Sequence, residues 1–391
     1  MHFCEISKSN YIYFSDLSKK YFIIYNICTR AKNFVPEKFA SVQKLLYLCA
    51  AILKKDEEIC IPMDKTQVYN SVRNCISEEL KAFERLFEGV LRTRVPLADS
   101  VIHYFLERSG KQLRPIMTLL SAKMLGNVNE ATTYGAVSLE LLHNATLMHD
   151  DVIDQSSTRR GSDTINKIWD NKVAVLMGDF FLSKCLYCSN ATGSLQISRV
   201  LSDMVTMLVE GELEQISNVR THLLSEDAYF SVIRGKTASL FAACMKIGAL
   251  SVEASEADKE RMAKVGELMG MVFQIRDDIF DYYPSTKEVG KPTGHDIMEG
   301  KITLPLLYAL QHAPADEAAR MRDIIEQPQE LTGSQVAMLV EFAKSIGGIE
   351  YAQAKMKNIS YEAKKLLSTF PESEARESLM CLIDYFSDRN Y

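Results

Sequence analysis

The distribution of proline constrains the fold of this 391-residue chain more than any other feature. The chain contains 10 prolines, and none of them lies between Pro115 and Pro284. Because proline removes a backbone donor and clashes with the preceding turn, a long stretch without it can hold several uninterrupted helices. Apolar residues recur at three-to-four spacing over 131–148 and 168–188, and alternating strand-like runs are scarce. The sequence therefore predicts an all-α chain.

A helical texture of the same kind covers 335–345 and 351–367. Residues 1–62 differ, because they are rich in aromatic residues and cysteine but show little sustained helical period. We therefore expect an N-terminal extension of unknown role at 1–62 and one helical domain at 63–391. Three origins of the extension stay open: a targeting segment, a lineage-specific addition, or translated sequence upstream of a true start at Met63.

Composition and charge exclude several classes of protein. With 47% hydrophobic and 25% charged residues, the chain has ordinary globular proportions, which excludes collagen-like, mucin-like and wholly disordered proteins. The formal net charge of −6, together with the lack of a basic run, speaks against a nucleic-acid partner. The apolar runs at 21–28 and 45–53 are far shorter than the roughly 20 residues of a membrane span, so we expect no transmembrane segment.

The cysteines predict a reducing compartment. The chain has 9 cysteines, spread unevenly, and they form no disulfide framework of the kind found in small secreted domains. We expect a cytoplasmic protein, with organelle targeting by residues 1–62 left open. Cys185 and Cys188 have CxxC spacing, but no second pair lies nearby to complete a zinc site, and a helical pattern runs through them. We interpret them as buried helix cysteines.

One acidic motif occurs twice: D-D-x-x-D lies at 150–154 and again at 277–281. On a helix, positions i, i+1 and i+4 lie close together, so each motif offers two or three carboxylates to one point. Like charges at this spacing destabilise a helix by ~0.2–0.5 kcal/mol unless a cation lies between them. Carboxylates together with substrate phosphates are the ligands that Mg²⁺ commonly uses. The two motifs therefore indicate a metal-bridged diphosphate.

A single D-D-x-x-D is more often a solvated acidic face than a set of metal ligands. Here the motif is repeated, and apolar residues precede both copies, at 145–148 and at 270–273. A solvated helix face would not be introduced in this way. We therefore prefer the interpretation as ligands.

Phosphate binding also needs cationic groups, and the chain has them in four short clusters. Arginine supplies a planar fork of donors and lysine a point charge. Each cluster alone is as readily a surface charge as a ligand. The clusters are Gly110-Lys111-Gln112-Leu113-Arg114-Pro115, Arg159-Arg160-Gly161, Lys236-Thr237 and Gly290-Lys291.

Taken together, these residues resemble the trans-isoprenyl diphosphate synthase family, the polyprenyl synthetases. The resemblance runs from about Gln67 to the C-terminus and includes the patterns GKxLRP, RRG, KT and GKPxGxD-x₄-K beside the paired aspartate motifs. It implies an isoprenoid synthase type helical bundle around a deep central cavity, usually as a homodimer. It also implies a Mg²⁺-dependent prenyltransferase that condenses isopentenyl diphosphate head-to-tail with an allylic diphosphate and releases diphosphate.

The resemblance assigns roles position by position. Six aspartates would hold three Mg²⁺ on the allylic diphosphate: Asp150, Asp151, Asp154, Asp277, Asp278 and Asp281. Further polar partners of this diphosphate would be Arg159, Lys236, Thr237, Gln274, Lys291 and Lys301. A clamp for isopentenyl diphosphate would consist of Lys111, Arg114, His143 and Arg160. The catalytic members of these sets would be Asp150, Asp151, Asp154, Lys236, Asp277 and Asp278.

His143 has independent support, since it lies two helical turns before Asp150 on the same face. Without the motifs, a core histidine bonded to a backbone carbonyl would be the simpler interpretation. The role of His149 is open, because His149-Asp150 also mimics the dyad of HD-type phosphohydrolases. That interpretation leaves the second aspartate motif unexplained.

Product length is predicted from the residues just before the first motif. In the family, bulky aromatic residues four or five positions before the first aspartate stop chain growth early, whereas Ala145 and Thr146 stand here. Ser138, Leu141 and Leu142, further up the same stripe, are not aromatic either. We therefore predict an all-trans product above the C20 class.

Four alternatives remain. A short-chain synthase, for farnesyl or geranylgeranyl diphosphate, would differ only in product length. A class I terpene cyclase carries an N-D-x-x-S-x-x-x-E second motif and needs no isopentenyl clamp. A non-catalytic synthase subunit usually loses part of one motif, and both are complete here. A plain helical scaffold would tolerate the loss of either motif.

Overall fold

The computed structural model describes residues 11–12, 61–62, 65–108, 110–159, 161–283, 293–327 and 329–388. The chain divides into two compact units, Met1–Asn70 and Ser71–Tyr391. In the first unit, strand β1 (Tyr11–Ile12) pairs antiparallel with β2 (Ile61–Pro62). The expected extension at 1–62 otherwise lies outside the described residues, so its role stays a prediction. Helix α3 (Lys65–Cys75) spans the boundary between the units.

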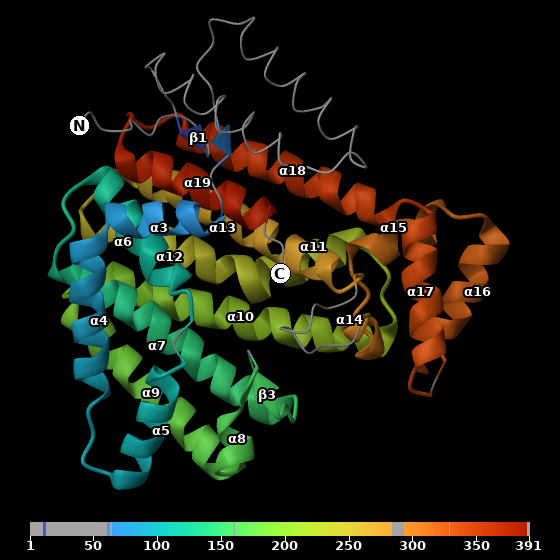
Figure 1. The fold of residues 1–391 in the computed structure, drawn as a ribbon, viewed down its shortest axis with the longest axis horizontal. Helices are drawn as coiled ribbons and strands as arrows, with labels where there is room; N and C mark the ends of the chain where they lie inside the picture. Colours follow the sequence, from blue (N-terminus) through green and yellow to red (C-terminus); the bar gives the residue numbers. More distant parts are fainter. Residues whose placement is uncertain are drawn as a thin grey trace, which may run out of the picture. The chain divides into compact units, whose positions relative to one another are not determined.

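The second unit is built from helices, which confirms the prediction of an all-α fold (Figure 1). A two-stranded hairpin joins β3 (Thr158–Arg159) to β4 (Ser162–Asp163). The helices are α4 (Ser77–Leu91), α5 (Pro96–Leu106), α6 (Leu113–Leu125), α7 (Glu130–Ile153), α8 (Ile165–Ile168), α9 (Asn171–Ala191), α10 (Leu195–Thr221), α11 (Glu226–Ile233), the π-helical turn η2 (Arg234–Ala238), α12 (Ser239–Ser251), α13 (Glu256–Phe280), α14 (His295–Met298), α15 (Leu304–His312), α16 (Ala315–Ile325), α17 (Gly333–Ser345), α18 (Gly348–Leu367) and α19 (Glu374–Asp388).

Helix α12 forms the centre of this unit. Almost every residue of α12 is buried, and the helix packs against α6, α7, α10 and α13. A helix that is apolar on all sides needs such an environment, because it has no polar face to turn to water. The long helices α7 and α13 therefore both lie against α12, and each of them ends in one of the two aspartate motifs.

One helix boundary differs from the expectation. The pattern predicted a helix from Ile168, but α8 ends there and α9 begins at Asn171. The cause is Asp170, whose side chain accepts a hydrogen bond from the Val173 amide at 2.8 Å and so caps α9. The helices predicted over 335–345 and 351–367 are confirmed as α17 and α18.

The cysteines of the described residues are buried: Cys75, Cys185, Cys188, Cys244 and Cys381. Burial raises the pKa of both Cys185 and Cys188 to about 12, so both thiols stay protonated near neutral pH. This supports the interpretation of the CxxC pair as core residues. No described helix has the length and apolar character of a membrane span.

Candidate active site

The first aspartate motif occupies the C-terminal turn of α7. The helix starts with a capping box between Asn129 and Thr132, and it runs uninterrupted to Ile153. Asp150 and Asp151 lie in its last turn, and Asp154 is the residue that ends it. The C-terminus of a helix carries partial negative charge, so carboxylates gathered there are unfavourable unless cations offset them.

The second motif has the same position on α13. Ser255 caps the start of this helix by accepting from the Asp258 amide, and the helix runs to Phe280. Asp277 and Asp278 lie in its last turn, and Asp281 ends it. Both motifs therefore place three carboxylates at the negative end of a long helix, which is an arrangement that calls for bound cations.

Within the first motif, the three carboxylates have different surroundings. Both Nε and Nη2 of Arg159, on strand β3, lie 2.8 Å from Oδ1 of Asp151, whose side chain is only 10% exposed. Burial raises the pKa of Asp150 to about 6, and the nearby Glu212 carboxylate adds to this effect. Asp154 is exposed. Asp151 thus already has a cationic partner within the protein.

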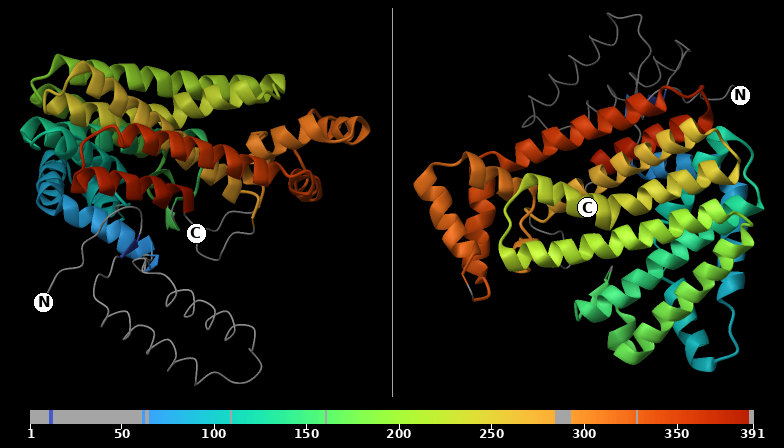
Figure 2. Two further views of the ribbon diagram at one scale, coloured as in Figure 1. Left: turned by 90° about the horizontal axis from the view of Figure 1, so that it is seen from above. Right: turned by 180° about the vertical axis from the view of Figure 1, so that it is seen from behind.

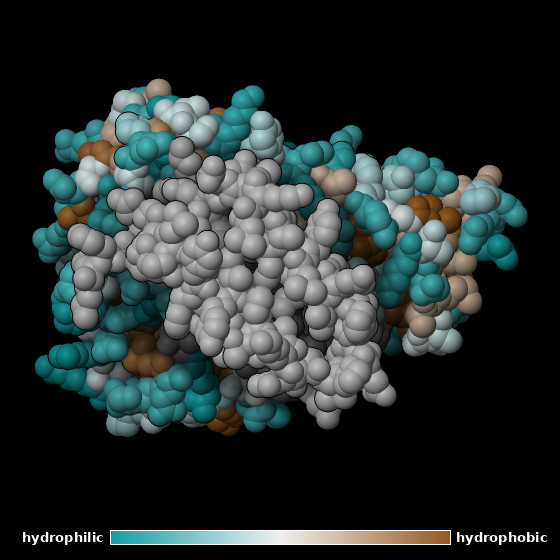
Figure 3. Space-filling view, turned by 45° about the horizontal axis from the view of Figure 1, so that its top comes forward, coloured by the Kyte–Doolittle hydropathy of each residue, from teal (hydrophilic) through white to brown (hydrophobic). Residues whose placement is uncertain are grey.

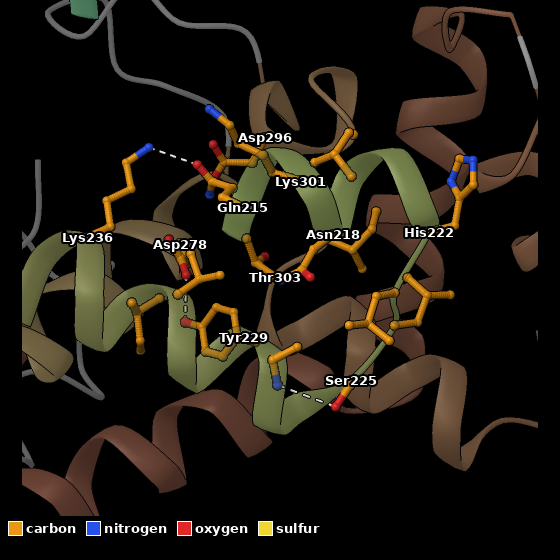
Figure 4. A pocket seen from close by; sticks show the side chains of 18 of the residues that line it. Gln215, Asn218, His222, Ser225, Tyr229, Lys236, Asp278, Asp296, Lys301 and Thr303 are labelled. Atoms are coloured by element: carbon orange, nitrogen blue, oxygen red, sulfur yellow. Dashed lines mark hydrogen bonds between the residues drawn. The ribbon is translucent and has the colours of Figure 1, made fainter. Parts of the chain in front are cut away.

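Within the second motif, Asp278 is held inside the protein. Tyr229 Oη donates to Asp278 Oδ2 at 2.6 Å, and Gln274 Nε2 donates to Oδ1 at 2.8 Å (Figure 4). Thr237 Oγ1 in turn donates to Gln274 Oε1 at 2.7 Å. Burial, with a contribution from the Asp296 carboxylate, raises the pKa of Asp278 to about 8. Both oxygens of this carboxylate are therefore oriented by neighbouring side chains.

Asp281 accepts hydrogen bonds from backbone amides that follow it in the sequence. Its Oδ1 accepts from the His295 amide and its Oδ2 from the Asp296 amide, both at 3.0 Å. These amides belong to the first turn of α14, so Asp281 satisfies donors that a helix start leaves open. It thereby fixes where Asp296 and the residues after α14 lie.

Two lysines, Lys236 and Lys301, lie near the first motif. Lys236, on η2, lies beside Asp150, and its positive charge counteracts the rise in the pKa of that carboxyl. Burial opposes the charged form of Lys301, yet its pKa is raised overall by a hydrogen bond to Glu299 and by the carboxylates of Asp296 and Asp154. Lys301 therefore lies within the electrostatic reach of the first motif, and it lines the same cavity as Asp278 of the second.

One cavity of about 210 Å³ is lined by five of the expected site residues: Lys236, Thr237, Gln274, Asp278 and Lys301 (Figure 4). They come from η2, from α13 and from the segment after α14, which are far apart in the sequence. A second cavity of about 330 Å³ lies between α5, α7 and the hairpin, with Asp151 and Arg159 in its wall. Neither cavity is lined by Ala145 or Thr146.

The residues expected to hold isopentenyl diphosphate are only partly described. Lys111 Nζ donates to Tyr385 Oη of α19 at 2.9 Å, and Arg114 lies in the first turn of α6. His143 is half-buried on α7. Arg160 and, from the allylic set, Lys291 lie outside the described residues. The clamp as a whole stays a prediction.

His149 does not join Asp150 in a dyad. Its Nε2 lies 3.2 Å from the Val175 carbonyl oxygen, and its ring fills the space that a side chain at Gly178 of α9 would need. Asp150 instead lies near Glu212 and Lys236. Neighbouring residues of a helix point about 100° apart, so the two side chains reach different surroundings.

Sequence reasoning missed three polar residues of this region, Glu212, Gln215 and Tyr229, and gave no role to Asp296, which is the aspartate of the GKPxGxD-x₄-K pattern. A weak signal for the first two exists, because Gly211 interrupts an amphipathic helical stretch, and an isolated glycine within a helix often marks close packing. Tyr229 gives no such signal, since a tyrosine on an amphipathic helix is ordinary.

Within the described residues, no three His, Cys, Asp or Glu side chains gather closely enough to form a metal site by themselves. The donor chemistry nevertheless fits Mg²⁺, which prefers oxygen ligands and commonly completes its shell with waters and substrate phosphates. Asp150, Asp154 and Asp277 provide carboxylates at the two helix ends.

Comparison with known proteins identifies the family. The family model described as polyprenyl synthetase matches residues 95–342. An octaprenyl diphosphate synthase of Haemophilus influenzae is 35% identical over 303 residues, which cover 77% of this chain and 91% of that protein.

Two solved structures share the fold. A polyprenyl synthase of Caulobacter crescentus, complexed with calcium and isoprenyl diphosphate, superposes with a TM-score of 0.76 at 30% identity, covering 82% of this chain and 98% of that one. A geranylgeranyl pyrophosphate synthase of Bacteroides thetaiotaomicron superposes with a TM-score of 0.71 at 40% identity, covering 83% and 100%. The chain belongs to the polyprenyl synthetase family.

Proposed function

We propose that this protein condenses isopentenyl diphosphate head-to-tail with an allylic diphosphate to give an all-trans polyprenyl diphosphate above the C20 class. One observation carries the proposal. Two aspartate motifs end the helices α7 and α13, and Lys236 and Lys301 lie within reach of them in one region. Such a mixture of carboxylates and fixed cations suits a magnesium diphosphate.

Mg²⁺ would be held by Asp150 and Asp154 of the first motif and by Asp277 of the second, with three ions expected in all. When bound, Mg²⁺ stabilises the negative charge of the departing diphosphate. Asp151 and Asp278 support these ligands from their hydrogen-bonded positions, since groups behind a metal ligand orient it.

The chain's own cations contribute to the same step. As the allylic carbon–oxygen bond breaks, diphosphate gains charge, so donors fixed around it bind the transition state more tightly than the substrate. We expect Lys236, Lys301 and Arg159 to act in this way, together with Lys291. The double bond of isopentenyl diphosphate then attacks the carbocation, and the proton that is lost goes to the departing diphosphate.

The isopentenyl diphosphate clamp provides orientation. Lys111, Arg114, His143 and Arg160 would hold the second substrate with its double bond toward the allylic carbon. Holding two reactants in line can lower a barrier by roughly 7–11 kcal/mol. Apolar surroundings would protect the carbocation from water.

The long product rests on small side chains and on the names of relatives. Ala145 is 2% exposed in the core of α7, and Ser138, Leu141 and Leu142 of the same helix are buried too, without an aromatic ring among them. The octaprenyl synthase of Haemophilus influenzae favours a long product, whereas the geranylgeranyl synthase of Bacteroides thetaiotaomicron represents the short-chain alternative.

The deciding experiment measures product length. We would incubate the protein with farnesyl diphosphate, excess isopentenyl diphosphate and Mg²⁺, and we expect products above C20. Products no longer than C20 would establish the short-chain alternative, and a cyclised hydrocarbon would establish a terpene cyclase. Ala145→Phe should shorten the product, and an unchanged distribution would show that chain growth does not pass this residue.

We also propose a homodimer. Helices α9 and α10 pack on each other, and α10 faces the viewer in the right-hand view of Figure 2. Half of the exposed large apolar side chains of the described residues lie on these two helices. They are Val175, Leu176, Leu186, Tyr187, Leu195, Met207, Val209, Leu213 and Ile216. On the coloured part of the face in Figure 3, hydrophobic residues form small separate patches among hydrophilic ones.

Monomeric proteins rarely expose large contiguous apolar patches. Light scattering on the purified protein should therefore give twice the mass of one chain. Leu186→Glu with Leu213→Glu should shift the mass to that of a monomer. A wild-type protein that is monomeric at micromolar concentration would contradict the dimer.

A further inference from the structure

We propose that Glu212 and Gln215 are positioning residues that hold the Lys236 ammonium toward the allylic diphosphate. This inference rests on the proposed function and goes beyond it, because neither residue belongs to the aspartate motifs or to the cationic clusters. Lys236 Nζ lies 2.5 Å from Glu212 Oε2 and donates to Gln215 Oε1 at 2.8 Å. Figure 4 shows Lys236 and Gln215 pointing toward each other at the edge of the cavity.

The two contacts fix how the Lys236 ammonium is rotated. A lysine ammonium has three N–H donors and rotates freely on a flexible stem. Contacts with Glu212 and Gln215 occupy two of the donors and fix the rotation of the group. The third donor is then directed away from α10, and Lys236 itself lines the cavity that contains Asp278. An incoming phosphate oxygen would meet a donor that is already oriented.

The backbone brings these side chains together. A Cβ atom at Gly211 would lie 2.7 Å from the backbone nitrogen of Lys236, and one at Gly235 would lie 3.0 Å from the carbonyl oxygen of Met207. Helix α10 and the π-helical turn η2 therefore touch backbone to backbone at a pair of glycines. Glu212 follows the first glycine and Lys236 follows the second, so the close contact places the two side chains opposite each other. Single π-helical turns of this kind are frequent at functional sites.

Partial burial strengthens the ion pair between Glu212 and Lys236. The side chains of Glu212 and Lys236 are each 34% exposed, so both have lost much of their contact with water. A fully exposed pair would contribute little, because solvent screens it. Glu212 also lies close enough to Asp150 to act on it electrostatically. The held ammonium thus lies next to the first aspartate motif as well as in the cavity beside the second.

The test compares the two substrates. In initial-rate measurements, Glu212→Ala should raise KM for farnesyl diphosphate about tenfold, which corresponds to the loss of one charge-assisted contact. KM for isopentenyl diphosphate should stay within about twofold of the wild-type value, because the clamp for that substrate is unaffected. Glu212→Gln should recover most of the loss, since it keeps an acceptor oxygen.

A matched control is available on the same helix. Glu214 accepts from Ser231 Oγ at 2.9 Å and makes no contact with Lys236 among the hydrogen bonds of the described residues. Glu214→Ala removes the same charge and should leave both KM values unchanged.

A double-mutant cycle separates positioning from general damage. In a Lys236→Ala background, adding Glu212→Ala should change KM for farnesyl diphosphate less than about twofold. A full tenfold effect in that background, or an equal rise of both KM values in the single variant, would overturn the proposal.

Binding of inorganic diphosphate with Mg²⁺, followed by calorimetry, tests the same cycle without turnover. We expect Glu212→Ala to weaken binding about tenfold and Glu212→Gln to weaken it less. If the wild-type protein binds diphosphate but forms no prenyl product, the proposed function fails while this cycle still decides the role of Glu212. Equal binding by wild type and Glu212→Ala would reject that role.

Discussion

The two aspartate motifs are identical in spacing and occupy equivalent positions at the ends of α7 and α13, but their carboxylates have different partners. In the first motif, one carboxylate pairs with Arg159 and another is exposed. In the second, Asp278 is bound by Tyr229 and Gln274, and Asp281 caps α14. The same sequence therefore performs different tasks, and the neighbouring elements decide which.

The difference also concerns how negative charge is stabilised. In the first motif, a cation of the protein, Arg159, pairs with Asp151. In the second motif, neutral donors stabilise much of the negative charge. Tyr229 and Gln274 donate to Asp278, and two backbone amides donate to Asp281. We infer that the first motif gains more from added metal, while the second provides a rigid wall.

The largest effect should come from the carboxylates that are expected to touch metal. Asp150→Asn and Asp277→Asn should each lower kcat/KM by on the order of a thousandfold, because each variant removes a charged ligand. Circular dichroism should show that both variants remain folded. A loss smaller than tenfold in either variant would remove that residue from the metal site.

A smaller effect should follow from the hydrogen bond behind the second motif. Tyr229→Phe leaves the buried Asp278 carboxylate without one donor, so we expect kcat/KM to fall roughly 10- to 100-fold and the Mg²⁺ requirement to rise.

Tyr351→Phe is the matched control for this hydrogen bond. Tyr351 donates to Glu226 Oε2 at 2.8 Å, and it does not line the cavity of Asp278. This variant should behave like the wild type. Equal behaviour of Tyr229→Phe and Tyr351→Phe would show that Asp278 does not need to be oriented.

Asp281 distinguishes a capping role from a metal role. Asp281→Asn keeps an acceptor oxygen for an α14 amide and should retain activity within about threefold, whereas Asp281→Ala should lose about 1 kcal/mol of unfolding free energy and more activity. Chemical denaturation and initial rates measure both. If Asn and Ala are equally inactive, the negative charge of Asp281 itself is required, as expected for a metal ligand.

The smallest effect concerns stability without metal. The pKa of Asp150, about 6, lies above its ordinary value of 3.8, so the folded state favours the protonated form. The stability that this group contributes is present at low pH and is lost as the pH rises through about 6. With EDTA at pH 8, Asp150→Asn should therefore melt a few degrees above the wild type, and this gain should vanish near pH 4.

Asp151→Asn should have the opposite sign, because it removes the ion pair with Arg159. Thermal melts of both variants under the same conditions decide the comparison. A lower Tm for Asp150→Asn at pH 8 would show that the Asp150 carboxylate is stabilised by the folded protein even without metal.

Much of the fold was predictable from the sequence. The all-α character and the helices α17 and α18 follow from local periodicity and from proline placement. The start of α9 was wrong by three residues because a side-chain cap at Asp170 outweighed the apolar pattern. Five predicted site residues line one cavity: Lys236, Thr237, Gln274, Asp278 and Lys301.

The partners of these residues were not predictable, because they come from elements that the sequence does not bring together. Tyr229 is a plain helix residue until α11 packs beside the end of α13. Glu212 faces Lys236 only because two glycines allow α10 and η2 to touch. Hydrogen bonds act over about 3 Å, so their formation depends on packing rather than on residue type.

The sequence by itself determined that the chain is helical, that it carries two sets of three carboxylates, and that these belong to a polyprenyl synthetase. Those properties follow from local periodicity and from motif spacing, which do not depend on distant contacts. Only the tertiary structure decided which aspartates face Arg159, Tyr229 or the amides of α14. The physical reason is that a carboxylate's role depends on the donors within hydrogen-bond distance, and packing supplies those donors.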